Sequence, residues 1–169
     1  YNDAASALME FFWNEFCDWY VEATKINFKN GDDKEKDRQA TVLMNILEES
    51  LRLLHPYIPF VTEEIYQKLP LAELVSTRKG KIITNSNYVG MLINAPYPEV
   101  VSERENDEIQ ERFDALKDLI AKVRAAKVDC GIDPAVKINI AIKTEKGSAA
   151  EVAKEKVEMI QLLAGVAKV

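Results

Sequence analysis

Apolar residues recur at intervals of three and four through three consecutive segments of this chain, and this spacing constrains the fold most strongly. The segments are residues 3–28, 34–54 and 59–69. Such spacing places the apolar side chains on one stripe of a helix. The links between the segments are short, so consecutive helices are expected to pack as antiparallel neighbours. The sequence therefore predicts an antiparallel helical bundle.

The residues at the segment boundaries support these limits. Asn30 and Gly31 are expected to end the first helix, because both tolerate the left-handed conformation used beyond a C-terminus. Asp32 or Asp33 stands near the positive end of the second helix, which favours an acid. His55-Pro56 ends that helix, since proline disfavours the helical conformation of the residue before it. Pro59 can open the third helix at its first turn.

The helical periodicity stops in the middle of the chain. Residues 71–98 lack a helical period and contain Gly, Pro, Asn and Ser, which indicates a long loop, with a short extended piece at Met91–Ile93. Ser102 and Glu105 have the spacing of a capping box. Apolar residues recur with helical spacing after them, so we expect a fourth helix over 103–128.

The last part has the pattern of a small α/β unit. Residues 136–142 alternate apolar and polar, as in a half-buried strand, and residues 148–165 have the pattern of a fifth helix. Residues 166–169 would begin a second strand. The fold class expected is therefore mainly α: a bundle with its long loop in residues 1–98, then a long helix and a truncated α/β unit in residues 99–169.

Composition excludes several classes of protein. The 169 residues include 22 Lys+Arg and 28 Asp+Glu, for a net charge of −6, which argues against general nucleic-acid binding. Charged residues interrupt the apolar runs before the roughly 20 residues that a membrane span needs, and the N-terminus does not resemble a signal peptide. We expect a soluble protein of the cytoplasm, and the absence of an initial Met suggests a piece of a longer chain.

Catalytic and metal-binding patterns are poor. Cys17 and Cys130 stand apart, and His55, the one histidine, has no neighbour at a metal-ligand interval, so no zinc site is expected. His55 is interpreted as a helix-ending residue that bonds nearby backbone. Glu63 and Glu64 are adjacent and diverge on a helix, so they are interpreted as dipole partners or caps rather than an acid–base pair.

Two groups of basic residues are candidates for contact with phosphates. Lys117, Arg124 and Lys127 have spacings that can put them on one solvent-facing edge of the fourth helix, whose second half is locally basic. Lys25 and Lys29 lie one turn apart near the end of the first helix. For both groups the alternative is a solvated helix face with no ligand.

Two segments carry a family resemblance. Residues 13–22, with the run Phe-Cys-Asp-Trp-Tyr, and residues 53–66, with His-Pro-Tyr-Ile-Pro-Phe-Val-Thr-Glu-Glu, closely resemble the anticodon-binding helical domain of the valyl-tRNA synthetase family. The second segment is shared with the isoleucyl and leucyl enzymes, so the first one discriminates. Residues 95–99 and 123–134 are also similar, and the resemblance covers nearly the whole chain.

The resemblance implies roles for particular residues. It places Val21 against the anticodon, where an apolar contact tests base shape, with Lys25 reaching phosphate or a base edge. Arg124 and Lys127 match two basic positions of the family, which implies tRNA contact or orientation of the following small unit. Lys127 stands where the family usually has arginine and lacks its planar fork. The tRNA-binding set expected is Val21, Lys25, Lys29, Lys117, Arg124 and Lys127.

The resemblance also implies what this chain does not do. The family uses ATP with magnesium on a catalytic domain bearing His-Ile-Gly-His and Lys-Met-Ser-Lys-Ser sequences, and neither occurs here. We therefore expect no catalytic residue, cofactor site or metal site in this chain. The implied partners are tRNA(Val) and the remaining domains of the parent synthetase, and neither a membrane nor DNA.

Three alternatives remain open from the sequence. An isoleucyl or leucyl-tRNA synthetase would carry the same domain. A helical protein-interaction module would suit the acidic net charge and the long loop. A self-contained enzyme is the weakest alternative, because the sequence offers no nucleophile–base pair.

Overall fold

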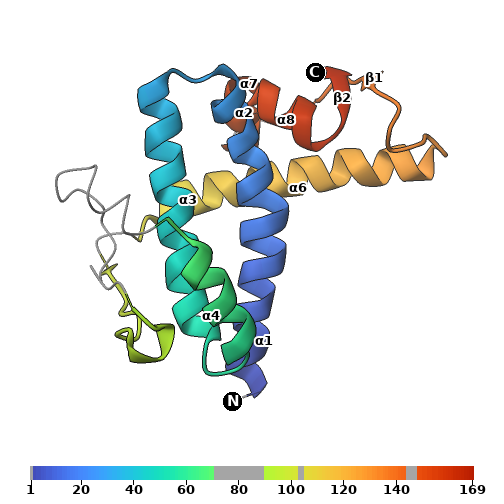
Figure 1. Cartoon of the computed structure of the whole chain (residues 1–169). Helices are drawn as coiled ribbons and strands as arrows, with labels where there is room; N and C mark the ends of the chain where they lie inside the picture. The colour runs from blue at the N-terminus through green and yellow to red at the C-terminus, as the bar shows by residue number, and fades with distance from the viewer. Residues whose placement is uncertain (1, 71–89, 103–104, 144–147) are drawn as a thin grey trace. The chain divides into compact units, whose positions relative to one another are not determined.

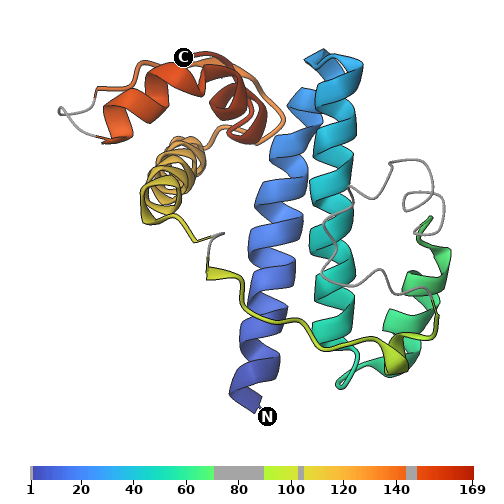
Figure 2. The same ribbon diagram turned by 90° about the vertical axis from the view of Figure 1, so that its left-hand side faces the viewer.

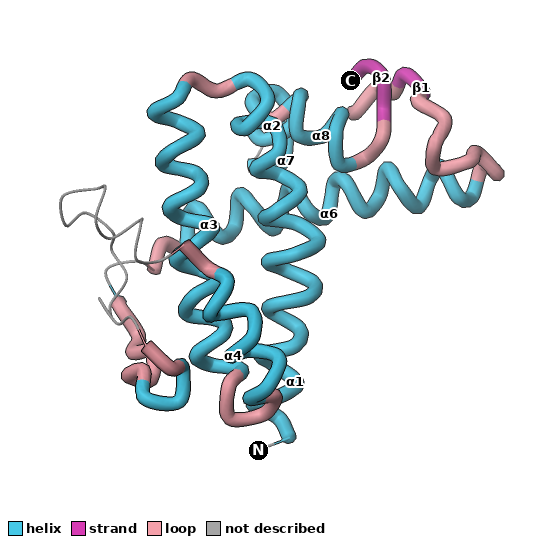
Figure 3. The backbone as a smooth tube through the Cα atoms, viewed as in Figure 1, coloured by secondary structure: helices cyan, strands magenta, loops and turns pink. Residues whose placement is uncertain are grey.

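The computed structural model describes the chain except residues 1, 71–89, 103–104 and 144–147. It forms two compact units, Tyr1–Val100 and Val101–Val169. The first is a set of packed helices and the second combines helices with a two-stranded sheet (Figures 1 and 3). The prediction of a mainly α fold with a small α/β unit is confirmed.

A long helix and its antiparallel neighbour form the body of the first unit (Figures 1 and 2). The long helix is continuous but has three parts, and a turn leads from it to the neighbour and then to a shorter helix. The elements are α1 (Asn2–Glu10), η1 (Phe11–Val21), α2 (Glu22–Asn30), α3 (Asp33–Leu54) and α4 (Pro59–Lys68).

The middle of the long helix is a π-helix, which the sequence did not predict. Apolar spacings of three and four indicated a helix, but over the 11 residues of η1 they do not separate the α form from the wider π form. Phe12, Phe16 and Tyr20 follow one another along it, with successive ring centroids 5.7 and 6.2 Å apart. Phe16 is buried, Phe12 and Tyr20 are half-buried, and Trp13 is 62% exposed, so only part of this aromatic stripe belongs to the core.

Gly31 ends the long helix where expected, but for a different reason. Its φ of −71° and ψ of 156° are extended, so the predicted left-handed conformation is wrong. A Cβ at Gly31 would lie 2.5 Å from the carbonyl oxygen of Asn27, which accepts from the Gly31 amide. Close approach of the backbone therefore requires the glycine. Asp32 then caps α3, its carboxylate accepting from the Glu35 amide at 2.8 Å.

The corner between α3 and α4 is held by side chains. His55 caps the end of α3 as predicted, but its ring Nδ1 lies 2.8 Å from the hydroxyl of Thr62 rather than bonding backbone. Leu51 and Tyr66 pack with Leu92 in a buried cluster. Leu92 belongs to η2 (Leu92–Asn94), a single 3₁₀ turn, so the extended piece predicted at Met91–Ile93 is wrong.

The second unit is built on α6 (Asp107–Asp129). Its N-cap is Asn106, whose side-chain oxygen accepts from the Ile109 amide at 3.0 Å. The helix thus begins four residues after the predicted start at 103, and the capping box predicted from Ser102 and Glu105 does not begin it. Ser102 and Asn106 are both suitable caps by type, and only the backbone conformation distinguishes them.

A β-α-β arrangement follows α6. Its elements are β1 (Ile138–Asn139), α7 (Ser148–Glu155), α8 (Val157–Leu163) and β2 (Val166–Lys168). The two strands are parallel, with Ile138 opposite Val166. Figure 3 shows β1 and β2 next to each other. The strand predicted over 136–142 is shorter than expected. The helix predicted over 148–165 is broken at Lys156, whose φ of −109° and ψ of 32° are not helical.

Candidate nucleic-acid interface

Val21, Lys25 and Lys29 follow one another at four-residue intervals along one face of the long helix. Val21 ends η1 and the two lysines belong to α2. Lys25 has 58% of its side chain exposed and pairs with Glu22 at 2.6 Å, while Val21 is half-buried and Lys29 exposed. This face presents one apolar side chain followed by two cations, as the sequence predicted. We call it the α2 face.

The opposite side of α2 packs within the first unit. Ala23 and Thr24 are buried, and the Thr24 hydroxyl donates to the Val21 carbonyl at 2.7 Å. Asn27 donates to Gln39 of α3 at 3.0 Å. The burial of Ala23 and Thr24 and the bond from Asn27 to Gln39 hold this side of α2 within the unit and leave Lys25 and Lys29 toward solvent.

The basic residues of α6 are arranged differently from the prediction. Lys117 lies 5.4 Å from the ring centroid of Phe113 and pairs with Asp114 at 2.8 Å, with 21% of its side chain exposed. Arg124 directs Nε and one terminal nitrogen at the carbonyl of Leu163, at 2.9 and 2.6 Å. Lys117 and Arg124 therefore both have partners within the second unit.

Lys127 does not lie on a solvent-facing edge, so that part of the prediction is wrong. Lys127 is only 4% exposed. Its ammonium donates to the carbonyls of Pro134, Val136 and Gly165 at 3.0, 2.9 and 3.1 Å. The ammonium thus uses its three donors on backbone oxygens. Of the two roles that the resemblance allowed, this geometry favours orientation of the small unit over direct contact with tRNA.

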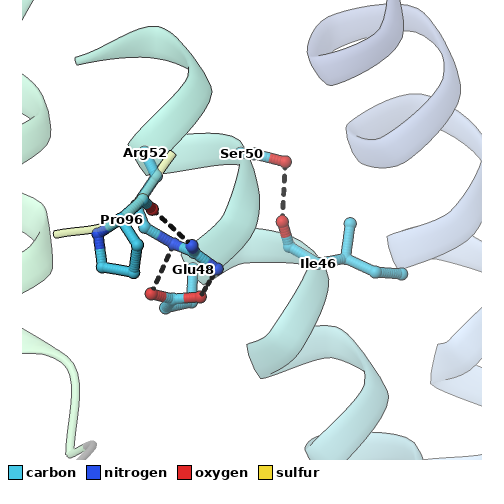
Figure 4. A network of polar contacts seen from close by, with 5 residues as sticks. All are labelled: Ile46, Glu48, Ser50, Arg52 and Pro96. Atoms are coloured by element: carbon cyan, nitrogen blue, oxygen red, sulfur yellow. Dashed lines mark hydrogen bonds and ion pairs between the residues drawn. The ribbon is translucent and has the colours of Figure 1, made fainter. Parts of the chain in front are cut away.

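Sequence reasoning missed a buried ion pair in α3 that holds a distant segment. Arg52 Nε lies 2.9 Å from Glu48 Oε1, and a terminal nitrogen donates to Glu48 Oε2 at 2.9 Å (Figure 4). The other terminal nitrogen donates to the Pro96 carbonyl at 2.7 Å. The side chains of Glu48 and Arg52 are 1% and 2% exposed. Their spacing of four residues on a buried helix face was the signal available.

Glu63 also holds a segment distant in sequence. Its carboxylate accepts from the Leu92 amide at 2.8 Å and from Gln67 at 2.6 Å, and Gln67 in turn donates to the Gly90 carbonyl at 3.0 Å. Glu64 pairs with Lys68 at 2.7 Å, and this hydrogen bond and charge lower the pKa of Glu64. The two glutamates therefore diverge, as predicted.

The two thiols differ in their surroundings. Burial, and then the charge of Asp18, raise the pKa of Cys17, which lies in η1. Cys130 is exposed just after α6.

In the part of the chain that the structure describes, no three His, Cys, Asp or Glu side chains gather as metal ligands would. No described helix combines the length and apolarity of a membrane span.

Comparison with known proteins gives this geometry its context. Residues 1–142 match the model of the anticodon-binding domain of tRNA ligase. The chain belongs to this family. The family resemblance predicted from the sequence is thereby confirmed, and the helices that carry Val21, Lys25 and Lys117 all lie within the matched residues.

Relatives of this anticodon-binding domain include valine–tRNA ligases of several bacteria. The ligase of Treponema denticola is 49% identical over 168 residues, which is 98% of this chain and 17% of the relative. That of Treponema pallidum is 44% identical over 143 residues, 85% of this chain and 14% of the relative. The Aquifex aeolicus ligase is 34% identical over 92% of this chain and 13% of its own length. The chain thus spans about one sixth or less of these relatives.

Proposed function

We propose that this chain is the anticodon-side part of a valine–tRNA ligase and that it binds and positions tRNA(Val). The observation that carries the proposal is the domain match over residues 1–142, together with 49% identity to a valine–tRNA ligase over 98% of the chain. The relatives named above favour the valyl member over the isoleucyl and leucyl alternatives.

The α2 face is the proposed contact with the anticodon. Val21 offers an apolar surface against which the shape of an unstacked base can be tested. Lys25 and Lys29 lie one and two turns farther on, and their exposed ammonium groups can neutralise phosphates. Binding that depends on phosphates weakens as salt rises. Glu22 pairs with Lys25 in the free protein, so tRNA must displace an exposed and therefore weak ion pair.

The second unit supports this contact in our proposal. We divide the chain into a bundle over residues 1–98 and a unit over residues 99–169 that helps to hold the tRNA. Lys117, which is half-buried and pairs with Asp114, is the phosphate contact that we propose for this unit. Arg124 and Lys127 act by holding the β-α-β arrangement on α6, because their donors are directed at backbone carbonyls.

Aminoacylation itself belongs to the remaining domains of the parent ligase. We assign the use of ATP with magnesium to those domains and none of it to this chain. The ligase acts in the cytoplasm, where tRNA is charged. The chain's contribution is therefore to the binding of tRNA and not to the activation of valine.

Replacing Val21 and Lys25 in the parent ligase tests this division of roles. The double variant Val21→Ala/Lys25→Ala is expected to raise the KM for tRNA about tenfold and to leave valine-dependent pyrophosphate exchange unchanged. Loss of pyrophosphate exchange in a folded variant would contradict the assignment. Charging assays with valine, isoleucine and leucine offered separately then test which member of the family the parent ligase is. We expect only valine to be attached to tRNA.

A further inference from the structure

Gln39 of α3 contacts the stretch that carries the α2 face at two points. Its side-chain nitrogen donates to the Tyr20 hydroxyl at 3.0 Å, and its side-chain oxygen accepts from Asn27 at 3.0 Å. Tyr20 directly precedes Val21, and Asn27 lies between Lys25 and Lys29. The amide of Gln39 therefore bridges both ends of the stretch that holds Val21 and Lys25.

The two partners of Gln39 are themselves held in place. The Tyr20 ring stacks on Phe16 with centroids 6.2 Å apart and an interplanar angle of 21°, and Phe16 is buried. The Asn27 carbonyl accepts from the Gly31 amide at 2.8 Å in the turn between α2 and α3. Gln39 thus connects a packed aromatic side chain at the end of η1 with the last turns of α2.

Contacts local to α2 do not define its rotation against α3. The Lys25–Glu22 pair and the bond from the Thr24 hydroxyl to the Val21 carbonyl both lie within the same helix. Gln39 comes from the neighbouring helix and contacts the stretch at both ends. Two fixed points on one side of a helix resist its rotation about its axis, and this rotation decides where Val21 and Lys25 are directed.

We propose that Gln39 is a positioning residue for the α2 face, which aligns Val21 and Lys25 for the tRNA without touching it. The proposal rests on the function proposed above. Small errors in the placement of a contacting group have large effects on recognition, because productive geometry tolerates little displacement. Loss of the Gln39 bridge should therefore weaken tRNA binding mainly through Lys25 and Val21.

A double-mutant cycle tests this coupling. The dissociation constant of an unmodified tRNA(Val) transcript is measured by filter binding at fixed salt for four proteins. These are the unsubstituted chain, Gln39→Met, Lys25→Ala and the double variant Gln39→Met/Lys25→Ala. Gln39→Met keeps the length of the side chain and removes both hydrogen bonds. Alone, it should weaken binding about fivefold, and in the Lys25→Ala background by less than about twofold. Fully additive effects, or an unchanged dissociation constant for folded Gln39→Met, would overturn the proposal.

Two controls separate positioning from a loss of folding. Tyr20→Phe removes one hydroxyl and should weaken binding in the same direction while its thermal unfolding midpoint stays near that of the parent chain. Gln110→Met changes an exposed glutamine of α6 and should leave the dissociation constant unchanged. Unchanged binding by folded Tyr20→Phe, or an equal loss in Gln110→Met, would overturn the proposal. Absence of binding by the unsubstituted chain would instead contradict the proposed function.

Discussion

The ammonium nitrogen of Lys127 lies 3.1 Å from the carbonyl oxygen of Gly165, which takes a φ of +62° between α8 and β2. The same nitrogen contacts the carbonyls of Pro134 and Val136, which precede β1. One lysine near the end of α6 therefore joins the beginning and the end of the β-α-β arrangement. Burial removes water from this ammonium, and its bonds to the three backbone carbonyls replace that hydration.

Removal of the Lys127 ammonium should loosen the small unit. Lys127→Met keeps an apolar stem but leaves three backbone carbonyls without this donor, and we expect the second unit to lose about 2 kcal/mol of stability. Hydrogen exchange of the Ile140 amide, which donates to the Lys168 carbonyl, measures the opening of the strand pair. Lys122→Met is the matched control, because Lys122 is 72% exposed and pairs with Asp118 at the surface. Equal protection of Ile140 in both variants would contradict this role of Lys127.

The buried ion pair of α3 should show a large asymmetry between single and double substitution. Arg52→Met leaves the Glu48 carboxylate buried without its partner, which is expected to cost about 3 kcal/mol or more. The double variant Glu48→Gln/Arg52→Met removes both charges and should recover part of that loss. Urea denaturation followed by circular dichroism compares them. A double variant less stable than Arg52→Met would refute this explanation.

Gly31 should tolerate no side chain, although its backbone angles are ordinary. Gly31→Ala would place a Cβ 2.5 Å from the Asn27 carbonyl, so the turn must shift, at a cost of about 1–2 kcal/mol. Gly131 provides the contrast. It has a φ of +66° and open space around it, so Gly131→Asn should be nearly neutral, because asparagine tolerates that conformation. Denaturation midpoints test both, and a neutral Gly31→Ala would contradict the close approach.

The two cysteines should react in a fixed order. Burial is the first cause that raises the pKa of Cys17, so its reactive thiolate becomes abundant only at a pH above the usual range for a thiol. Alkylation with iodoacetamide at pH 8, followed by mass spectrometry, should modify exposed Cys130 first. Asp18→Asn removes the second cause alone and should accelerate Cys17 only modestly. Faster alkylation of Cys17 than of Cys130 would contradict this order.

Helical spacing predicted the elements whose cause is local. The second helix was expected over 34–54 and is observed over Asp33–Leu54, because a cap, an apolar stripe and a proline all lie within its own sequence. The α2 face follows from the same periodicity. Residue types did not determine two other features. They did not show that Asn106 rather than Ser102 caps α6, nor that η1 is a π-helix rather than an α-helix.

The contacts that sequence reasoning missed join residues far apart in the chain. Arg52 and Pro96 are 44 residues apart, and Lys127 and Gly165 are 38 apart. Lysines are mostly exposed, so a solvent-facing Lys127 was the natural expectation. Its burial depends on three carbonyls that only the folded unit brings together. The role of Gln39 was missed in the same way, because its partners Tyr20 and Asn27 lie 19 and 12 residues before it.

The most direct test of the account is the salt dependence of tRNA binding by this chain. An unmodified tRNA(Val) transcript is titrated with the unsubstituted protein and with Lys25→Ala/Lys29→Ala at several salt concentrations. We predict that the unsubstituted protein binds more weakly as salt rises and that the double variant binds more weakly with a slope smaller by roughly one to two counterions. Equal affinity and equal slope for the two proteins would contradict the claim that the α2 face contacts the tRNA.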